Sequence, residues 1–143
     1  KGRKAIIVGG GNSAVTEALH MHNIGVDVTL VHRRDDLKAQ DVLVKNLIQN
    51  NIPILFNSEV QEIKGKHNVE EVLLYNNKTK ETSTLAVSAV FIAIGYDPAV
   101  SLARKIGLEL TEDGFIKHDQ YRTNIPGIYS AGDVSGGYKQ RRR

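Results

Sequence analysis

Three small residues, Gly9, Gly11 and Ala14, have the spacing of a phosphate-binding turn. The segment "GGGNSA" (9–14) fits the pattern glycine, any residue, glycine, any two residues, alanine. Between a strand and a helix, the first glycine makes the bend and the second lets a pyrophosphate approach the backbone. The third small residue lets the helix pack closely on the strand. The free amides and partial positive charge at the start of the helix then favour phosphate. The alternative is a tight strand-to-helix turn without a ligand.

A second group able to bind phosphate is a run of basic residues: His32, Arg33, Arg34 and Lys38. Arg33 lies 22 positions after Gly11, close to where a dinucleotide-binding domain recognises the ribose. A 2′-phosphate needs cationic donors there, and the planar fork of arginine donates two parallel hydrogen bonds. This favours NADP. In one alternative, the run is a solvated cluster balanced by Asp35 and Asp36; in another, one of these carboxylates binds the ribose of NAD.

Weaker candidates lie in the first predicted helix and near the end of the chain. The hydroxyl or amide of Ser13 can reach a pyrophosphate, although a helix cap explains this residue equally well. Glu17, one turn later, lies on the side that can approach a cofactor, although a solvated salt bridge is the commoner role. Asp133 follows Gly132 at the expected end of a strand, where it can bind a polyol or ribityl chain or cap a helix.

Hydrophobic patterning predicts the elements that position these residues. Apolar runs predict strands at 5–8, 26–32, 52–56 and 90–95, and helical spacing predicts helices at 12–23 and 39–50. Asn12 or Ser13 is expected to cap the first helix and Gly25 to end it. Mixed runs between 59 and 87, separated by turn formers, predict a three-stranded antiparallel meander. The predicted fold class is α/β: a Rossmann-like, three-layer dinucleotide-binding domain with a parallel sheet of about four strands and this inserted meander.

The composition limits the classes of function. Without the last three arginines the chain has 16 basic and 16 acidic residues, and only 6% of its residues are aromatic, which disfavours a nucleic-acid binder. It contains no cysteine, which excludes a disulfide framework or thiol redox centre within it. The histidines show no metal-ligand spacing. The sequence has no apolar run long enough to span a bilayer and no signal-peptide pattern, so we expect a cytoplasmic protein that does not bind membranes.

Four segments together resemble a known family: "VGGGNSAVTEAL", "VTLVHRRDDLKA", "FIAIGYDP" and "TNIPGIYSAGDV". In this order they are similar to the low-molecular-weight thioredoxin reductases, which belong to the pyridine nucleotide-disulfide oxidoreductases with two dinucleotide domains. The resemblance implies an NADPH site made of Gly9, Gly11, Asn12, Ser13, Ala14, Glu17, His32, Arg33, Arg34, Lys38, Ala93, Ile94 and Gly95. It also implies that Gly132, Asp133, Lys139 and Gln140 bind FAD in the complete protein. Thr16 departs from the family, where an acidic residue is common.

The resemblance also predicts an organisation and an activity. Residues 1–95 are expected to form the NADPH-binding domain, and residues 96–143 a truncated returning segment of a FAD-binding domain. The complete protein is expected to be a homodimer that transfers hydride from NADPH to FAD and electrons to thioredoxin or a similar disulfide protein. The family's N-terminal FAD motif and its Cys-x-x-Cys pair do not occur in this chain, so the chain alone is expected to be inactive. Alternatives are a ferredoxin or flavodoxin NADP reductase, a non-catalytic dinucleotide-binding module, and a nucleic-acid binder using the arginine tail.

Overall fold

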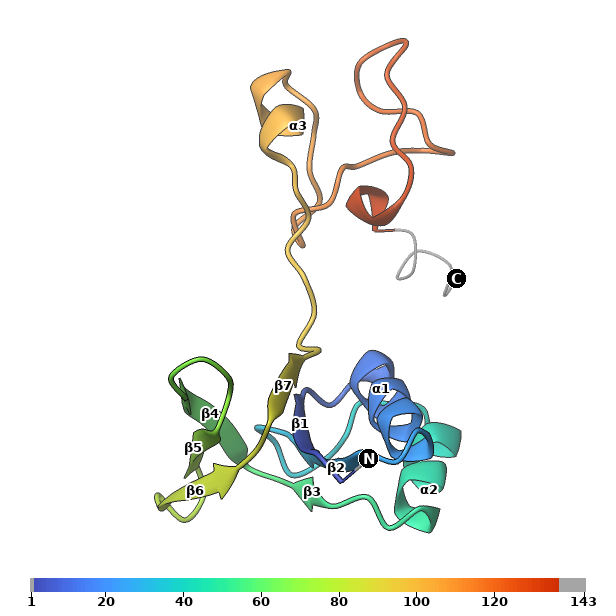
Figure 1. The fold of residues 1–143 in the computed structure, drawn as a ribbon. Coiled ribbons are helices and arrows are strands. Elements are labelled where there is room, and N and C mark those ends of the chain that lie inside the picture. The colour runs from blue at the N-terminus through green and yellow to red at the C-terminus, as the bar shows by residue number, and fades with distance from the viewer. Residues whose placement is uncertain (1, 137–143) are drawn as a thin grey trace. The chain divides into compact units, whose positions relative to one another are not determined.

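The computed structural model describes residues 2–136, which form two compact units that divide between Ile94 and Gly95. Figure 1 shows their elements. In the first unit these are Lys4–Val8 (β1), Asn12–Asn23 (α1), Asp27–Val31 (β2), Asp41–Gln49 (α2), Ile54–Leu55 (β3), Ser58–Lys64 (β4), Glu71–Asn76 (β5), Thr82–Ala86 (β6) and Ala89–Ile92 (β7). In the second unit they are the short helix Ser101–Lys105 (α3) and the 3-10 turn Asp133–Ser135 (η1).

The first unit contains the predicted α/β fold. Four strands form a parallel sheet in the order β3-β2-β1-β7, and three form an antiparallel sheet in the order β4-β5-β6. The meander lies in the chain between β3 and β7, as predicted. The third parallel strand is shorter than expected, with only two residues.

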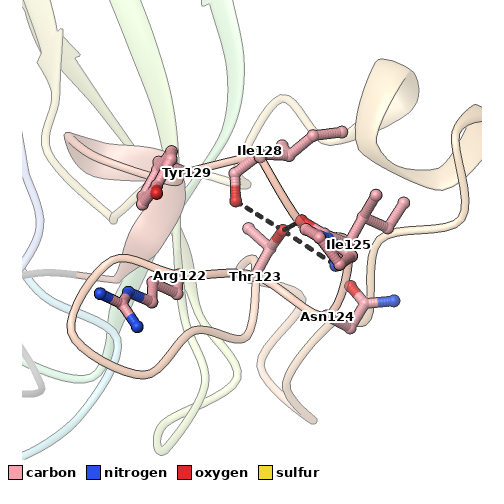
Figure 2. A pocket seen from close by; sticks show the side chains of 8 residues that line it. Arg122, Thr123, Asn124, Ile125, Ile128 and Tyr129 are labelled. Atoms are coloured by element: carbon pink, nitrogen blue, oxygen red, sulfur yellow. Dashed lines mark hydrogen bonds between the residues drawn. The ribbon is translucent and has the colours of Figure 1, made fainter.

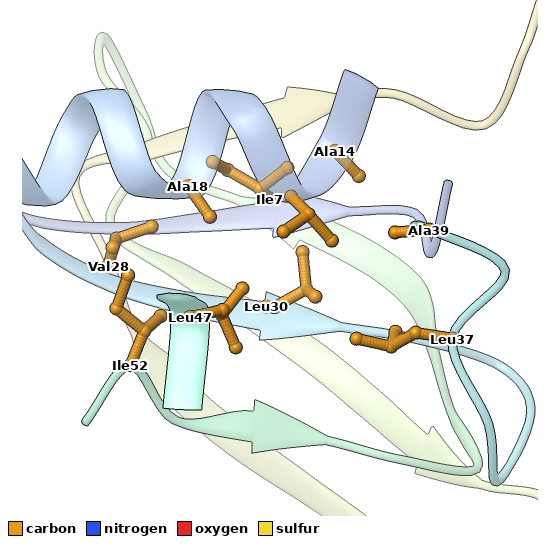
Figure 3. Close-up of a cluster of buried hydrophobic side chains, with 10 residues drawn as sticks. Ile7, Ala14, Ala18, Val28, Leu30, Leu37, Ala39, Leu47 and Ile52 are labelled. Carbon is orange, nitrogen blue, oxygen red and sulfur yellow. The ribbon is translucent and has the colours of Figure 1, made fainter. Parts of the chain in front are cut away.

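The parallel sheet is covered on both faces, which explains the apolar runs in its strands, such as 5–8 in β1. Ile7 faces a core shared with α1 and α2, whereas its neighbour Ile6 faces a core shared with the meander. Both side chains are fully buried. Successive residues of a strand point to opposite faces, so a strand buried on both sides needs a continuous apolar run. Figure 1 shows the helices on one side of the sheet and β4–β6 on the other, and Figure 3 shows the helix-side core.

The start of α1 differs from the prediction, whereas its end agrees with it. The residue preceding α1 is Gly11, and no side chain caps this end; the predicted caps by Asn12 or Ser13 are wrong. The Asn12 side chain instead accepts a hydrogen bond from the Gln40 N–H (2.8 Å). The predicted stop at Gly25 is confirmed, because its φ of +84° reverses the chain and its N–H donates to the C=O of His22 (2.9 Å).

The second unit has a small core of its own, made of Val100, Ala103, Leu108 and Ile116. Its extended segments meet only in isolated bridges, such as Arg122 with Tyr129. The strand expected to end on Gly132 and Asp133 is absent from this described segment, because the φ of +80° at Gly132 turns the chain and Asp133 begins η1.

Within residues 2–136, no helix is long and apolar enough to cross a membrane.

Candidate dinucleotide site

Three loops of the first unit begin at the same edge of the parallel sheet. Val8, the last residue of β1, lies beside the last residues of β2 and β7, so Gly9, His32 and Ala93 are the first residues of adjacent loops. The Gly9 N–H also donates to the C=O of Val31 (3.0 Å). The order of the strands reverses at β1, and open α/β sheets bind ligands at the carboxyl ends of strands beside such a reversal.

Two of the turn glycines meet different surroundings. A Cβ on Gly9 would lie 2.4 Å from the carbonyl oxygen of Ala93 and 2.9 Å from the Cβ of Ala14, so packing within the protein requires this glycine. A Cβ on Gly11 would meet no atom within 4 Å. The backbone of Gly11 is also extended, with φ −94°, a conformation open to any residue. Nothing in the described protein therefore requires glycine at position 11.

The buried ring of His32 lies against the middle glycine of the turn, Gly10. A Cβ on Gly10 would lie 2.3 Å from Cε1 and 2.4 Å from Nδ1 of this imidazole. His32 is only 9% exposed, and its Nε2 has no hydrogen-bond partner within residues 2–136. His32 was predicted as part of the basic run, but its environment differs from that of Arg33 and Arg34, which are both exposed.

The start of α1 offers hydrogen-bond donors to an anion. The first helical bond runs from the Val15 N–H to the C=O of Gly11 (3.2 Å). The N–H groups of Asn12, Ser13 and Ala14 have no acceptor among the described residues, as expected for a helix without a side-chain cap. The first turn also contains no acidic side chain. A phosphate here would meet free donors and the positive end of the helix dipole.

In the loop that follows β2, residues 33–38 contain cations that form no ion pair with a carboxylate within residues 2–136. We call it the arginine loop. Arg33, Arg34, Asp35 and Asp36 are all exposed. The ion pairs among residues 2–136 involve Lys64 and Lys117 only, so the arginines are not paired with the neighbouring aspartates. Their guanidinium groups remain available to an anion.

Two hydrogen bonds, donated by the backbone N–H groups of Lys38 and Gln40, hold the end of the arginine loop beside the glycine turn. The Lys38 N–H donates to the C=O of Gly10 (2.7 Å). The Gln40 N–H donates to the side-chain oxygen of Asn12. The Lys38 side chain is exposed. The two phosphate-binding candidates, which are remote in sequence, are therefore neighbours at one edge of the sheet.

The other predicted site residues differ in their surroundings. Glu17 is half-buried in the second turn of α1, and Ile94 is 72% exposed after β7. Gly95 has a φ of +106°. Gly132 and Asp133 are exposed in the second unit, whereas Lys139 and Gln140 lie outside the described residues.

A hollow of about 420 Å³ lies in the second unit and is lined by residues 122–129 (Figure 2). The Thr123 hydroxyl closes this loop by donating to the C=O of Ile128 (2.9 Å). The hollow contains none of the predicted NADPH residues, so we do not assign the dinucleotide to it.

No three His, Asp or Glu side chains within residues 2–136 are grouped to hold a metal ion.

Sequence reasoning missed three residues that shape the site. Gly10 occupied an "any residue" position of the glycine pattern, although the run of three glycines was a signal. Gln40 and Asn77 act through hydrogen bonds to Asn12 and Arg33, and no sequence pattern indicated those contacts.

A parallel sheet with helices on one face and a glycine turn between its first strand and first helix is the arrangement of the Rossmann-like fold. Comparison with known sequences identifies the family. The profile described as "Pyridine nucleotide-disulphide oxidoreductase" matches residues 1–143, and the chain belongs to this family.

The individual relatives confirm the resemblance to thioredoxin reductases. A thioredoxin reductase of Borreliella burgdorferi is 38% identical over 137 residues, which cover 94% of this chain and 42% of the relative. A ferredoxin–NADP reductase of Metallosphaera sedula is 37% identical over 136 residues, covering 94% of this chain and 41% of the relative. The crystal structure of T. acidophilum thioredoxin reductase matches with a TM-score of 0.87 and 33% identity, over 96% of this chain and 46% of that one. The chain thus spans less than half the length of these relatives.

Proposed function

We propose that residues 1–95 are the NADPH-binding domain of a flavin-dependent disulfide reductase similar to thioredoxin reductase. Residues 96–143 are then the returning segment of its FAD-binding domain, with Gly132, Asp133, Lys139 and Gln140 toward FAD. When bound, NADPH supplies a hydride to FAD, through which electrons reach the disulfide of thioredoxin or a similar protein. The complete protein acts as a homodimer.

The open space beside Gly11 is the observation that carries the proposal. A Cβ on this residue would meet no atom within 4 Å, and Gly11 directly precedes Asn12, Ser13 and Ala14, whose N–H groups have no acceptor among the described residues. A pyrophosphate fits the chemistry of this donor set, because it can approach a glycine backbone closely and accept several N–H bonds. These residues bind and orient the dinucleotide; they do not themselves react.

The cations of the arginine loop favour NADPH over NADH. Arg33 and Arg34 follow β2, which lies next to β1 in the sheet, and neither is neutralised by an ion pair within the described residues. A 2′-phosphate gains charge-assisted hydrogen bonds from such side chains. The ribose of NAD, in contrast, is usually bound by a carboxylate.

Titration of the chain with NADP⁺ and with NAD⁺ by isothermal calorimetry tests the proposal. We expect tighter binding of NADP⁺. Equal affinities, or no binding of either nucleotide, would contradict the assignment. Because the chain contains no cysteine, we expect it to bind nucleotide without reducing disulfides by itself.

A ferredoxin–NADP reductase of the same architecture is the second candidate. The relative from Metallosphaera sedula, which carries that name, matches almost as well as the thioredoxin reductases. Both candidates use NADPH and FAD, so the NADP⁺ titration does not separate them. Sequencing the gene upstream of residue 1 does, because only the disulfide reductase requires a cysteine pair.

A further inference from the structure

The turn between β5 and β6 reaches across to the arginine loop through one side chain, Asn77. Its Nδ2 donates to the C=O of Arg33 (2.8 Å), 44 residues away in sequence. The same Nδ2 donates to Oε1 of Glu59 on β4 (3.0 Å). Both partners are acceptors, which establishes that the nitrogen, and not the oxygen, of the amide faces the loop.

A second contact from the same side holds the next residue of the arginine loop. The Asn77 N–H donates to the C=O of Asn57 (2.7 Å), and the Asn57 N–H donates to the C=O of Arg34 (3.0 Å). The backbone carbonyls of Arg33 and Arg34 therefore both accept hydrogen bonds linked to Asn77. The arginine side chains remain exposed, so this bracing acts on their backbone only.

We propose that Asn77 is a positioning residue for 2′-phosphate recognition, through which the meander sets the preference for NADP over NAD. This inference rests on the proposed function of Arg33 and Arg34. Long cationic side chains lose conformational freedom when they bind a phosphate, and a mobile backbone beneath them adds to that cost. By holding the backbone in place before the nucleotide arrives, Asn77 lowers the cost for the 2′-phosphate. The pyrophosphate site at Gly11 does not depend on it.

The neighbouring residue Asn76 provides a matched control. Its Oδ1 accepts hydrogen bonds from the N–H groups of Lys78 (2.9 Å) and Thr79 (3.0 Å). Asn76→Asp keeps this acceptor, whereas Asn77→Asp replaces the donor by an oxygen that faces a carbonyl and a carboxylate. The two substitutions add the same charge at adjacent residues, and only Asn77→Asp removes the donor to the Arg33 carbonyl. Asn77→Ala removes the donor without adding charge.

The experiment measures NADP⁺ and NAD⁺ binding by calorimetry for the parent chain, N77A, N77D, N76D and the double variant R33A/R34A. Circular dichroism checks that each variant is folded. We expect N77A and N77D to bind NADP⁺ about 3- to 10-fold more weakly, as for the loss of one hydrogen bond, with NAD⁺ binding unchanged. N76D is expected to match the parent.

Hydrogen exchange without nucleotide provides a readout that does not depend on binding. Peptides covering 33–40 and 55–60 should exchange faster in N77A and N77D than in N76D, because the Arg33 carbonyl loses its side-chain donor. The adjacent bond from the Asn57 N–H to the Arg34 C=O should then open more often. Equal exchange in all three variants would overturn the inference.

The results distinguish the two proposals. If N77A and N77D keep the parent's selectivity while R33A/R34A loses it, the role of Asn77 is wrong and the proposed function stands. If the parent itself shows no preference for NADP⁺, the proposed function fails and Asn77 has no selectivity to support. An equal loss of NAD⁺ binding would also overturn the inference, since it would indicate a general structural role.

Discussion

The imidazole of His32 occupies the space that a side chain on Gly10 would need, with Cε1 only 2.3 Å from where a Cβ would lie. Gly10 does not have a positive φ, so its own backbone conformation does not demand glycine. Glycine is required at position 10 because the buried ring of His32, the residue that follows β2, fills the space beside it. Thus Gly9 and Gly10 are required by contacts within the protein, whereas Gly11 is open.

Gly10→Ala is expected to destabilise the first unit by about 1–3 kcal/mol, the usual cost of overpacking. The cost should shrink in a His32→Ala background, because the ring that the new methyl group meets is gone. Urea unfolding of the two single variants and the double variant measures this coupling. Strictly additive free energies would show that the two residues do not interact.

Gly11→Ala is expected to weaken nucleotide binding while leaving the fold intact. Reduced freedom of the unfolded chain stabilises by about 0.4–1 kcal/mol, and the loss of glycine before α1 costs about 0.5–1 kcal/mol, so the two effects nearly cancel. Binding of NADP⁺ and NAD⁺ should weaken together by about tenfold or more, because both carry the pyrophosphate. Calorimetry and urea unfolding on the same sample test both parts. Unchanged binding would contradict the pyrophosphate site.

Replacing Arg33 and Arg34 together by alanine should reduce NADP⁺ affinity by at least about 30-fold, as two charge-assisted contacts are lost. NAD⁺ affinity should hardly change. Replacement of both by lysine keeps the charge but loses the fork, so its NADP⁺ affinity should lie between those of the parent and the alanine variant. A parallel loss of NAD⁺ binding would indicate a damaged fold and not a lost phosphate contact.

Asn12→Asp should separate the effects of charge on the helix and on the ligand. The carboxylate still accepts the hydrogen bond from Gln40 and lies in the first turn of α1, where a negative charge stabilises by about 0.3–1 kcal/mol. The same charge should repel a pyrophosphate, so both nucleotides should bind more weakly. Thermal unfolding and calorimetry measure the two effects. Tighter binding of either nucleotide in this variant would speak against phosphate at the start of α1.

The sequence by itself determined the fold class and most elements of the first unit. The apolar run before Gly9 predicted a strand buried on both faces. The spacing of Ala14, Val15 and Ala18 predicted a helix with one buried face. These are local properties of neighbouring residues, so patterning predicted them, together with the glycine turn and the basic run after β2. The end of α1 at Gly25 was predicted for the same reason.

Only the tertiary structure decided how the predicted residues share the site. Asn12 was expected to cap its own helix but accepts a bond from Gln40, and His32 was grouped with the arginines but lies buried against Gly10. Asn77 contacts Arg33 only because the meander packs on the opposite face of the sheet from the helices. Such contacts join residues that are remote in the chain, and they arise from the register and packing of whole strands, which no local pattern encodes.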